Sequence, residues 1–428
     1  MKTSGSRAPE SANKCELVER SDGSKLAIVQ YPVMRPVERV AIGFAACGLL
    51  AVISSCGGGG GGGPVNTGTG TGTTGGTTPP AITTKAQLGK AFFNDTTLSN
   101  PKGESCGTCH SENRAFTDPR PGPTSPGAVA GVFGFRHAPS IGYMAFSPNF
   151  SNTAGEQGGP LGGQFWDGHA TDLADQAHFP MLNPFEMNNA SVGAIVATVQ
   201  AGPYAAALEK LYGATIFSNS TTAFNAIVDS IVKFEQTAEV SPFTSKYDAF
   251  LAGTVQLSAA ETRGLAVFNG QGGCSGCHTS SPALDGTPPL FTNFCYANLG
   301  LPKNPNNPFY KDPASDNPQG ANFIDYGVQR TTGQAAEAGM FMTPSLRNVV
   351  ATPPYFHNGI YNTLQEVINF YNTRDIGNFP PPEVPANEDM TELGNLGLTQ
   401  QNISDLVAFL NTLTDGYTAT SPDYRPRR

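Results

Sequence analysis

The chain contains CGTCH at residues 106–110 and CSGCH at residues 274–278. Both stretches follow the pattern C-x-x-C-H, in which two thiols bond the vinyl groups of a c-type haem and the adjacent histidine lies under the iron. A disulfide framework would not explain a histidine after each pair, and a Cys₂His₂ zinc site would need the two stretches to meet. The sequence therefore predicts two covalently bound haems. The attaching thiols are Cys106, Cys109, Cys274 and Cys277, and the iron ligands are His110 and His278.

Similar segments precede the two motifs, LGKAFFNDTTLSNPKGESCGTCH ending at residue 110 and LSAAETRGLAVFNGQGGCSGCH ending at residue 278. Each contains an apolar helical stretch, a phenylalanine and a glycine-rich turn before the motif. Glycine (50) and proline (35) are plentiful and charged residues make up only 14%, which indicates long, turn-rich connections. We expect a mainly α fold of two cytochrome c-like helical haem domains with long loops, at residues 84–250 and 251–428.

The segment before the folded body is typical of export. Residues 34–56, MRPVERVAIGFAACGLLAVISSC, hold two arginines, an apolar run and small residues before a cysteine, as a secretory signal does. We expect residues 1–55 to be a signal segment, with 34–55 the signal itself. Cys56 ends a stretch that resembles a bacterial lipobox, so it is the expected lipid anchor, and the Gly/Thr-rich residues 56–83 form a flexible linker. An uncleaved anchor helix is the alternative, although the apolar run is short for a bilayer.

These features place the mature protein in the periplasm as a membrane-anchored lipoprotein, with the lipid as its only membrane contact. The net charge of −9 makes nucleic acid an unsuitable partner. Cys295 is left over from the haem motifs, and we expect it to be a buried thiol.

Four longer motifs extend the pattern: SCGTCHSENRAFTD (105–118), QFWDGHATDLADQAHFPMLNPFEM (164–187), GGCSGCH (272–278) and TPSLRNVVATPPYFHNG (343–359). In this order they resemble the bacterial di-haem cytochrome c peroxidase family, which includes MauG. The resemblance implies a peroxidatic haem in the first domain and an electron-transfer haem in the second. It also implies a calcium ion between them.

The resemblance assigns roles around the first haem. Glu186 matches the family's distal acid, which would take a proton from peroxide and return it to the departing oxygen if desolvation raises its pKa. A solvated surface glutamate is the alternative. Gln176 and Pro180 match residues that line the same pocket. Trp166, the only tryptophan, matches a tryptophan that relays electrons between the haems, and a plain core residue is the alternative.

Tyr371 has two interpretations. A capping box at 363–366 starts a helix on which Leu364, Val367, Ile368 and Tyr371 share one face, which is typical of core packing. Tyr371 is also fourteen residues beyond His357, where ordinary family members carry a methionine ligand of the second iron. MauG-like members carry a tyrosine ligand there, which would lower the iron's potential.

Met340 and Met342 are the alternative ligands of the second iron. On the first haem, the family's distal histidine has no counterpart, because residues 111–136 contain none. The first iron is therefore expected to be open on its distal side, unless His137 or His169 reaches it. His137 also replaces an asparagine of the family's calcium site, for which Thr352 and Pro354 match the other contributors.

The leading interpretation is an exported di-haem c-type peroxidase that reduces hydrogen peroxide to water. Its electrons would come from a small periplasmic donor such as a cytochrome c or a cupredoxin. A MauG-like oxidase that modifies a partner protein through a high-valent di-haem state is the first alternative. A non-enzymatic di-haem electron-transfer cytochrome is the second, although a pure carrier needs no distal acid such as Glu186. A homodimer is compatible with all three.

Overall fold

Helices form most of the regular structure in the described part of the chain, as the sequence predicts. The computed structural model describes residues 15–19, 25–29 and 81–418. The predicted signal at 34–55, the anchor Cys56 and nearly all of the linker at 56–83 lie outside the described residues. Near the N-terminus, β1 (Cys15–Glu19) pairs antiparallel with β2 (Lys25–Val29), which the sequence did not lead us to expect.

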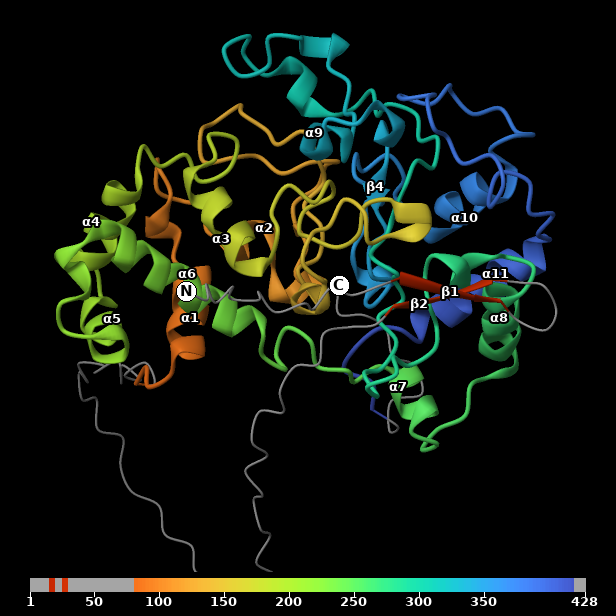
Figure 1. The fold of residues 1–428 in the computed structure, drawn as a ribbon, viewed down its shortest axis with the longest axis horizontal. Helices are drawn as coiled ribbons and strands as arrows, with labels where there is room; N and C mark the ends of the chain where they lie inside the picture. Colours follow the sequence, from red (N-terminus) through yellow and green to blue (C-terminus); the bar gives the residue numbers. More distant parts are fainter. Residues whose placement is uncertain (1–14, 20–24, 30–80, 419–428) are drawn as a thin grey trace, which may run out of the picture. The chain divides into compact units, whose positions relative to one another are not determined.

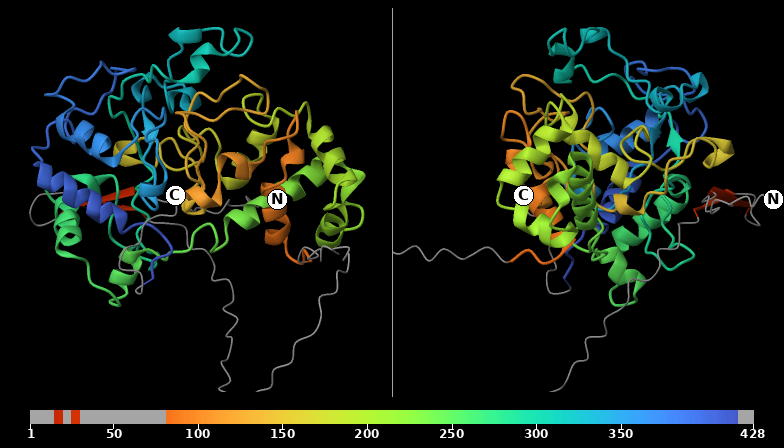
Figure 2. Two further views of the ribbon diagram at one scale, coloured as in Figure 1. Left: turned by 180° about the vertical axis from the view of Figure 1, so that it is seen from behind. Right: turned by 60° about the vertical axis from the view of Figure 1, so that its left-hand side comes forward.

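The first haem motif is surrounded by helices that pack around α6 (Ser220–Glu235). Helix α1 (Lys85–Phe93) begins at a capping box formed by Thr84 and Gln87, close to the predicted start of the folded body. It lies along α6 (Figure 2), and a side chain at Gly89 would collide with the α6 backbone. Helices α3 (Leu173–Leu182), α4 (Val192–Ala201) and α5 (Ala205–Tyr212) complete this group, and α2 (Cys106–Cys109) carries the thiols.

The second haem motif is also preceded by a helix that packs on another helix. Helix α8 (Ala259–Asn269) precedes it and packs closely on α11 (Gln400–Asn411) (Figure 1), where Gly264 faces the α11 backbone with no room for a Cβ atom. Helices α7 (Lys246–Leu251), α9 (Gln329–Thr332) and α10 (Leu364–Thr373) belong to this half. Helices α1 and α8 thus confirm the apolar helical stretch predicted before each motif.

Three hydrophobic clusters form the core. One joins buried residues between 88 and 240, and a second joins buried residues between 247 and 413. The third joins residues from both sides, namely Tyr143, Leu161, Leu290, Phe294, Cys295 and Met342. It lies beside the short pair β3 (Tyr296–Ala297) and β4 (Phe341–Met342). Cys295 is buried, as expected, and the domain boundary at residue 250 stays a prediction.

Long loops connect these elements and contain short 3₁₀ turns. The turns are Thr96–Leu98, Glu112–Arg114, Met144–Phe146, Glu156–Gly158, Ile216–Ser218, Cys274–Gly276, Pro308–Lys311, Gly320–Asn322, Ala335–Glu337 and Val349–Ala351. Within the described residues, none of the helices has the length and apolar character needed to cross a bilayer.

Candidate di-haem active site

One cavity of about 830 Å³ holds both haem motifs on its wall. From the first motif its lining includes Cys106, Cys109 and His110, and from the second Cys274, Cys277 and His278. The motifs begin at residues 106 and 274, so the fold brings distant parts of the chain to a shared space.

The two motif histidines are oriented as ligands. His110 Nδ1 lies 3.1 Å from the carbonyl oxygen of Phe116, and His278 Nδ1 lies 2.8 Å from that of Phe291. An imidazole that donates its Nδ1–H to a carbonyl keeps the Nε2 lone pair for a metal. Burial lowers the pKa of His110, and lowers that of His278 to about 4, so both rings are neutral at physiological pH.

The four motif thiols fit covalent attachment to a porphyrin. All four are free of disulfide bonds and line the cavity. Burial raises the pKa of each thiol, to about 12 for Cys109 and Cys274. The paired cysteines, each pair followed by a histidine whose Nδ1 faces a main-chain carbonyl oxygen, therefore fit two c-type haems.

The predicted distal residues lie together on and just after α3. Gln176, Pro180 and Glu186 all line the cavity. Asn183 donates a hydrogen bond from Nδ2 to Glu186 Oε1 over 2.9 Å. Desolvation raises the pKa of Glu186 to about 7, against the opposing effects of Asn183 and of the His169 charge. Glu186 can therefore both accept and return a proton near neutral pH.

Trp166 is fixed on the cavity wall. Its indole Nε1 donates to the carbonyl oxygen of His137 over 2.8 Å, and its own carbonyl oxygen accepts from the Met342 amide over 2.9 Å. The side chain is 9% exposed. Because the same wall carries both motifs, the ring lies where a relay between them could act.

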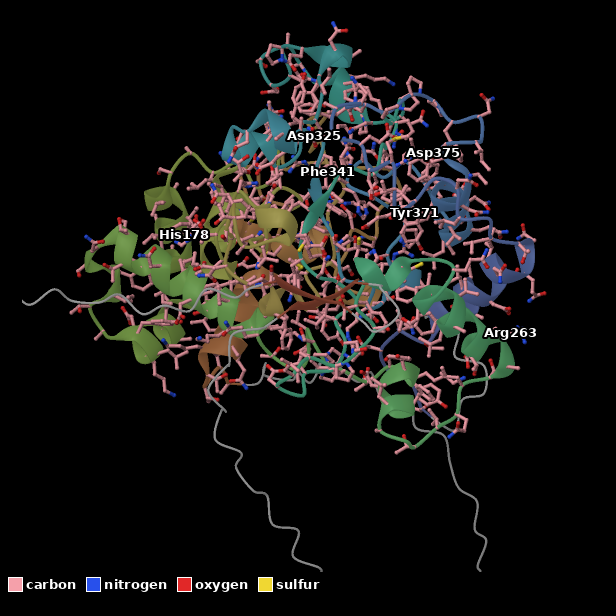
Figure 3. All side chains as sticks on the ribbon, turned by 45° about the vertical axis from the view of Figure 1, so that its right-hand side comes forward. His178, Arg263, Asp325, Phe341, Tyr371 and Asp375 are labelled. Atoms are coloured by element: carbon pink, nitrogen blue, oxygen red, sulfur yellow. The ribbon has the colours of Figure 1, made fainter. Side chains whose placement is uncertain are left out.

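Tyr371 lies on α10 (Figure 3), which begins at the predicted capping box of Thr363 and Glu366. Leu364 and Ile368 of the same stripe are buried in the second cluster, whereas Tyr371 lines the cavity. Burial, and to a smaller extent the electrostatic influence of Cys277 and Cys274, raises the pKa of Tyr371 well above its ordinary value. Among the described residues its hydroxyl has no hydrogen-bond partner, so core packing explains the ring but leaves the oxygen unexplained.

Met342 lines the cavity as well, and it is buried in β4. Met340 is partly buried, and its carbonyl oxygen accepts from the Val328 amide. Tyr371 thus offers the cavity an oxygen that no described residue binds, whereas Met342 belongs to the third hydrophobic cluster.

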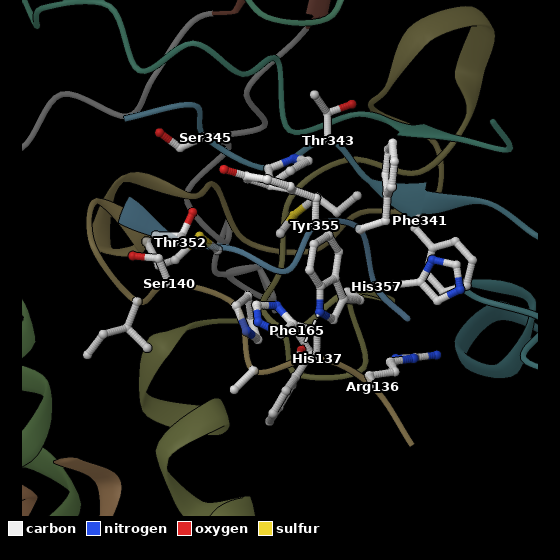
Figure 4. Close-up of a pocket in the computed structure, with 18 of the residues that line it drawn as sticks. Arg136, His137, Ser140, Phe165, Phe341, Thr343, Ser345, Thr352, Tyr355 and His357 are labelled. Carbon is white, nitrogen blue, oxygen red and sulfur yellow. Dashed lines mark hydrogen bonds between the residues drawn. The ribbon is translucent and has the colours of Figure 1, made fainter. Parts of the chain in front are cut away.

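The residues expected at the calcium site, His137, Thr352 and Pro354, also line the cavity; Figure 4 labels His137 and Thr352. The His137 carbonyl oxygen already accepts from Trp166, and the Thr352 hydroxyl donates to the Val349 carbonyl. No group of three or more histidine, cysteine, aspartate or glutamate side chains suited to a metal occurs in the described ranges. Calcium stays a prediction.

His137, one of the two histidines that could reach the first iron, lines the cavity. Its amide donates to the His357 carbonyl oxygen over 2.7 Å, and its buried Nε2 has no partner among the described residues. Burial lowers its pKa to about 4, and the charge of His110 acts in the same direction. The charge of His169 instead lowers the pKa of Glu186, so of the two histidines it is the one that acts on the expected distal acid.

Comparison with known proteins agrees with this geometry. The family model described as di-haem cytochrome c peroxidase matches residues 83–256. The methylamine utilization protein MauG of Paracoccus denitrificans (strain Pd 1222) is 37% identical over 356 residues, covering 78% of this chain and 90% of MauG. The chain belongs to the di-haem cytochrome c peroxidase family. It is therefore an oxidoreductase, and the family implies two c-type haems as its cofactors.

Two further di-haem peroxidases are similar to this chain. Cytochrome c551 peroxidase of Nitrosomonas europaea is 28% identical over 341 residues, covering 79% of this chain and 81% of that protein. The crystal structure of the diheme peroxidase BthA from Burkholderia thailandensis E264 has a TM-score of 0.69 and 32% identity, covering 78% of this chain and 86% of BthA. These similarities support the predicted mainly helical fold of a di-haem protein.

Two features of the site were not expected from the sequence. Glu235 on α6 is 5% exposed, lines the cavity, and has an Oε2 atom without a partner among the described residues. Burial raises its pKa to about 8. Its position on the apolar stripe of α6, one turn after Ile231, was the available signal. The second feature is the pair formed by Asp167 and His169, for which spacing alone gives no signal.

Proposed function

We propose that this protein is an exported di-haem peroxidase that reduces hydrogen peroxide to water, with two electrons and two protons consumed per peroxide. When bound, the first haem iron would supply the peroxide-binding position and the electron-transfer chemistry. His110 would hold that iron and Cys106 and Cys109 its porphyrin, while His278, Cys274 and Cys277 would hold the second.

The observation that carries this proposal is the Glu186 carboxyl on the cavity wall, with a pKa of about 7. A carboxylate there takes the proton of the incoming peroxide and returns it to the departing oxygen. The Asn183 amide holds the carboxyl in place through Oε1. A pure electron carrier has no use for such a group, which disfavours the non-enzymatic alternative.

Trp166 is the proposed electron relay, because its ring is held at two points on the shared wall. The absence of a histidine from residues 111–136 supports a first iron that is open on its distal side. A small periplasmic cytochrome c or cupredoxin is the proposed donor.

Tyr371 favours a second candidate function. Its unpartnered hydroxyl on the cavity wall, near the second motif, supports a tyrosine ligand of the second iron. A MauG-like oxidation of a partner protein would use that ligand, because an anionic oxygen donor stabilises the oxidised metal.

The decisive experiment mixes the diferric protein, purified with its haems, with hydrogen peroxide in a stopped-flow instrument. Optical and EPR spectra are followed with time. A high-spin signal that is lost within the first phase is expected. Two low-spin signals without a reaction would refute the proposal.

The Tyr371→Phe variant tests the ligand, with Tyr361→Phe as the matched control because Tyr361 is half-buried beside the same Phe370 ring. We expect only Tyr371→Phe to change the spectrum of the second haem. An unchanged spectrum would reduce Tyr371 to a packing residue.

The remaining proposals concern export and calcium. We propose that the protein is carried to the periplasm and anchored through a lipid on Cys56, and that calcium binds near His137, Thr352 and Pro354. Intact mass of the membrane-extracted protein should show one lipid group and two haems. Metal analysis after dialysis should show calcium, and its complete absence would remove that part of the proposal.

A further inference from the structure

Asp167 and His169 form a fixed pair at the edge of the cavity. His169 Nδ1 lies 2.5 Å from Asp167 Oδ1, and the other Asp167 oxygen lies 2.8 Å from Arg136 Nη1. The Asp167 side chain is buried, whereas the His169 side chain is 37% exposed. The carboxylate is thus enclosed and doubly paired, and the imidazole reaches solvent.

Two phenylalanines hold the imidazole ring. Phe165 stacks on it with centroids 4.0 Å apart and an interplanar angle of 11°, and Phe179 of α3 meets it edge-on at 5.2 Å. With Nδ1–H donated to Asp167, Nε2 is the nitrogen left to exchange protons. No described residue forms a hydrogen bond with that nitrogen, and the ring lines the cavity.

Glu186 is the acidic side chain that we connect with this imidazole. Both line the cavity, and the charge of His169 acts on the Glu186 carboxyl. The hydrogen-bond partner of that carboxyl is the Asn183 amide, which donates a hydrogen bond but cannot supply a proton. The reduction of peroxide consumes protons, so Glu186 needs a group that delivers them from bulk solvent.

We propose that His169 carries protons from bulk solvent to Glu186, with Asp167 as the positioning residue; this rests on the proposed peroxidase function. In the step, Nε2 binds a proton from bulk water and the ring becomes an imidazolium whose charge Asp167 offsets. The Nε2–H bond then breaks as an O–H bond forms on the Glu186 carboxylate, and His169 returns to its neutral form. The Nδ1 proton stays with the hydrogen bond to Asp167.

The other charged groups around His169 leave this route open. Arg136 faces Asp167 and is also paired with Asp325. Asp175 of α3 accepts from the Thr171 amide. His178, the next histidine in the chain, has its ring nitrogens bonded to the Ala174 carbonyl and the Asn225 side chain, so it provides a matched control.

The test measures peroxide turnover of the holoprotein with an artificial electron donor, together with the first stopped-flow phase after peroxide addition. In His169→Gln we expect turnover at pH 8 to fall about tenfold to hundredfold. The first phase should stay within about twofold, because Glu186 takes and returns the same proton in that step. His178→Gln should behave as the wild type.

His169→Arg separates proton transfer from charge. Arginine keeps a positive charge beside Asp167 but cannot release its proton, so its turnover should stay low. Wild-type turnover in His169→Arg, or in His169→Gln, would overturn the proposal. A low-spin first haem that becomes high-spin in His169→Gln would also overturn it, because His169 would then be an iron ligand. Failure of the wild type to react with peroxide would instead refute the peroxidase function itself.

Discussion

Glu186→Gln is the substitution that most directly tests the distal acid. The amide has nearly the shape of the carboxyl but cannot take a proton from peroxide. Because the pKa of Glu186 is about 7, about half of the molecules carry the carboxylate at pH 7, about one-tenth at pH 6 and about one-hundredth at pH 5. Reactivity that needs the carboxylate must therefore be lost as the pH falls through 7.

The expected magnitude follows from general acid–base catalysis, which contributes about 10²–10⁴-fold. The rate constant of the wild type with peroxide should fall about tenfold per pH unit below 7. That of Glu186→Gln should be lower by about 10²–10⁴-fold at pH 8 and should lack the inflection.

The assay is stopped-flow absorbance of the diferric holoprotein mixed with excess peroxide between pH 5 and 9. Glu209→Gln is the matched control, because Glu209 lies exposed on α5. A wild-type rate without an inflection near pH 7, or a variant as fast as the wild type, would show that Glu186 is not the acid–base group.

Three other substitutions test the surroundings. Asn183→Leu removes the hydrogen bond that lowers the pKa of Glu186, so the inflection of the peroxide rate should move to higher pH; an unmoved inflection would contradict this. Gly264→Ala should lower the free energy of unfolding by about 3 kcal/mol in urea denaturation, because its Cβ would collide with the α11 backbone, whereas Gly193→Ala, whose Cβ would meet only Ser191 Oγ at 3.7 Å, should cost little. Burial raises the folded-state pKa of Glu235 from 4.5 to about 8. The contribution of the protonated Glu235 to the free energy of unfolding is therefore complete below pH 4.5 and is lost as the pH rises through 8. The loss is at most about 5 kcal/mol, and Glu235→Gln should abolish that part of the pH dependence; equal slopes in both proteins would refute it.

Local sequence patterns correctly predicted the helices next to the site. The capping box at 363–366 and the apolar stripe after it correspond to α10, and the helical stretches before each haem motif correspond to α1 and α8. These features depend on residues within a few turns of one another, so a single sequence shows them.

Contacts between distant segments were harder to foresee. The hydrogen bond from Trp166 to the His137 carbonyl and the ion pair of Arg136 with Asp325 join loops without periodicity. Sequence could name Trp166 and Tyr371 only through the family resemblance. It could not show that the Tyr371 hydroxyl has no hydrogen-bond partner in the part of the chain that the structure describes, because that depends on every element around the cavity.

The acceptors of the two motif histidines have a consequence for how the haems would differ. His110 and His278 both donate to neutral main-chain carbonyls, so each imidazole keeps its Nδ1 proton and neither gains the anionic character that a carboxylate partner would confer. On this side the two irons would receive almost the same electron density. A difference in chemistry between the two haems would then have to come from other residues of the cavity, such as the Glu186 carboxyl and the Tyr371 hydroxyl.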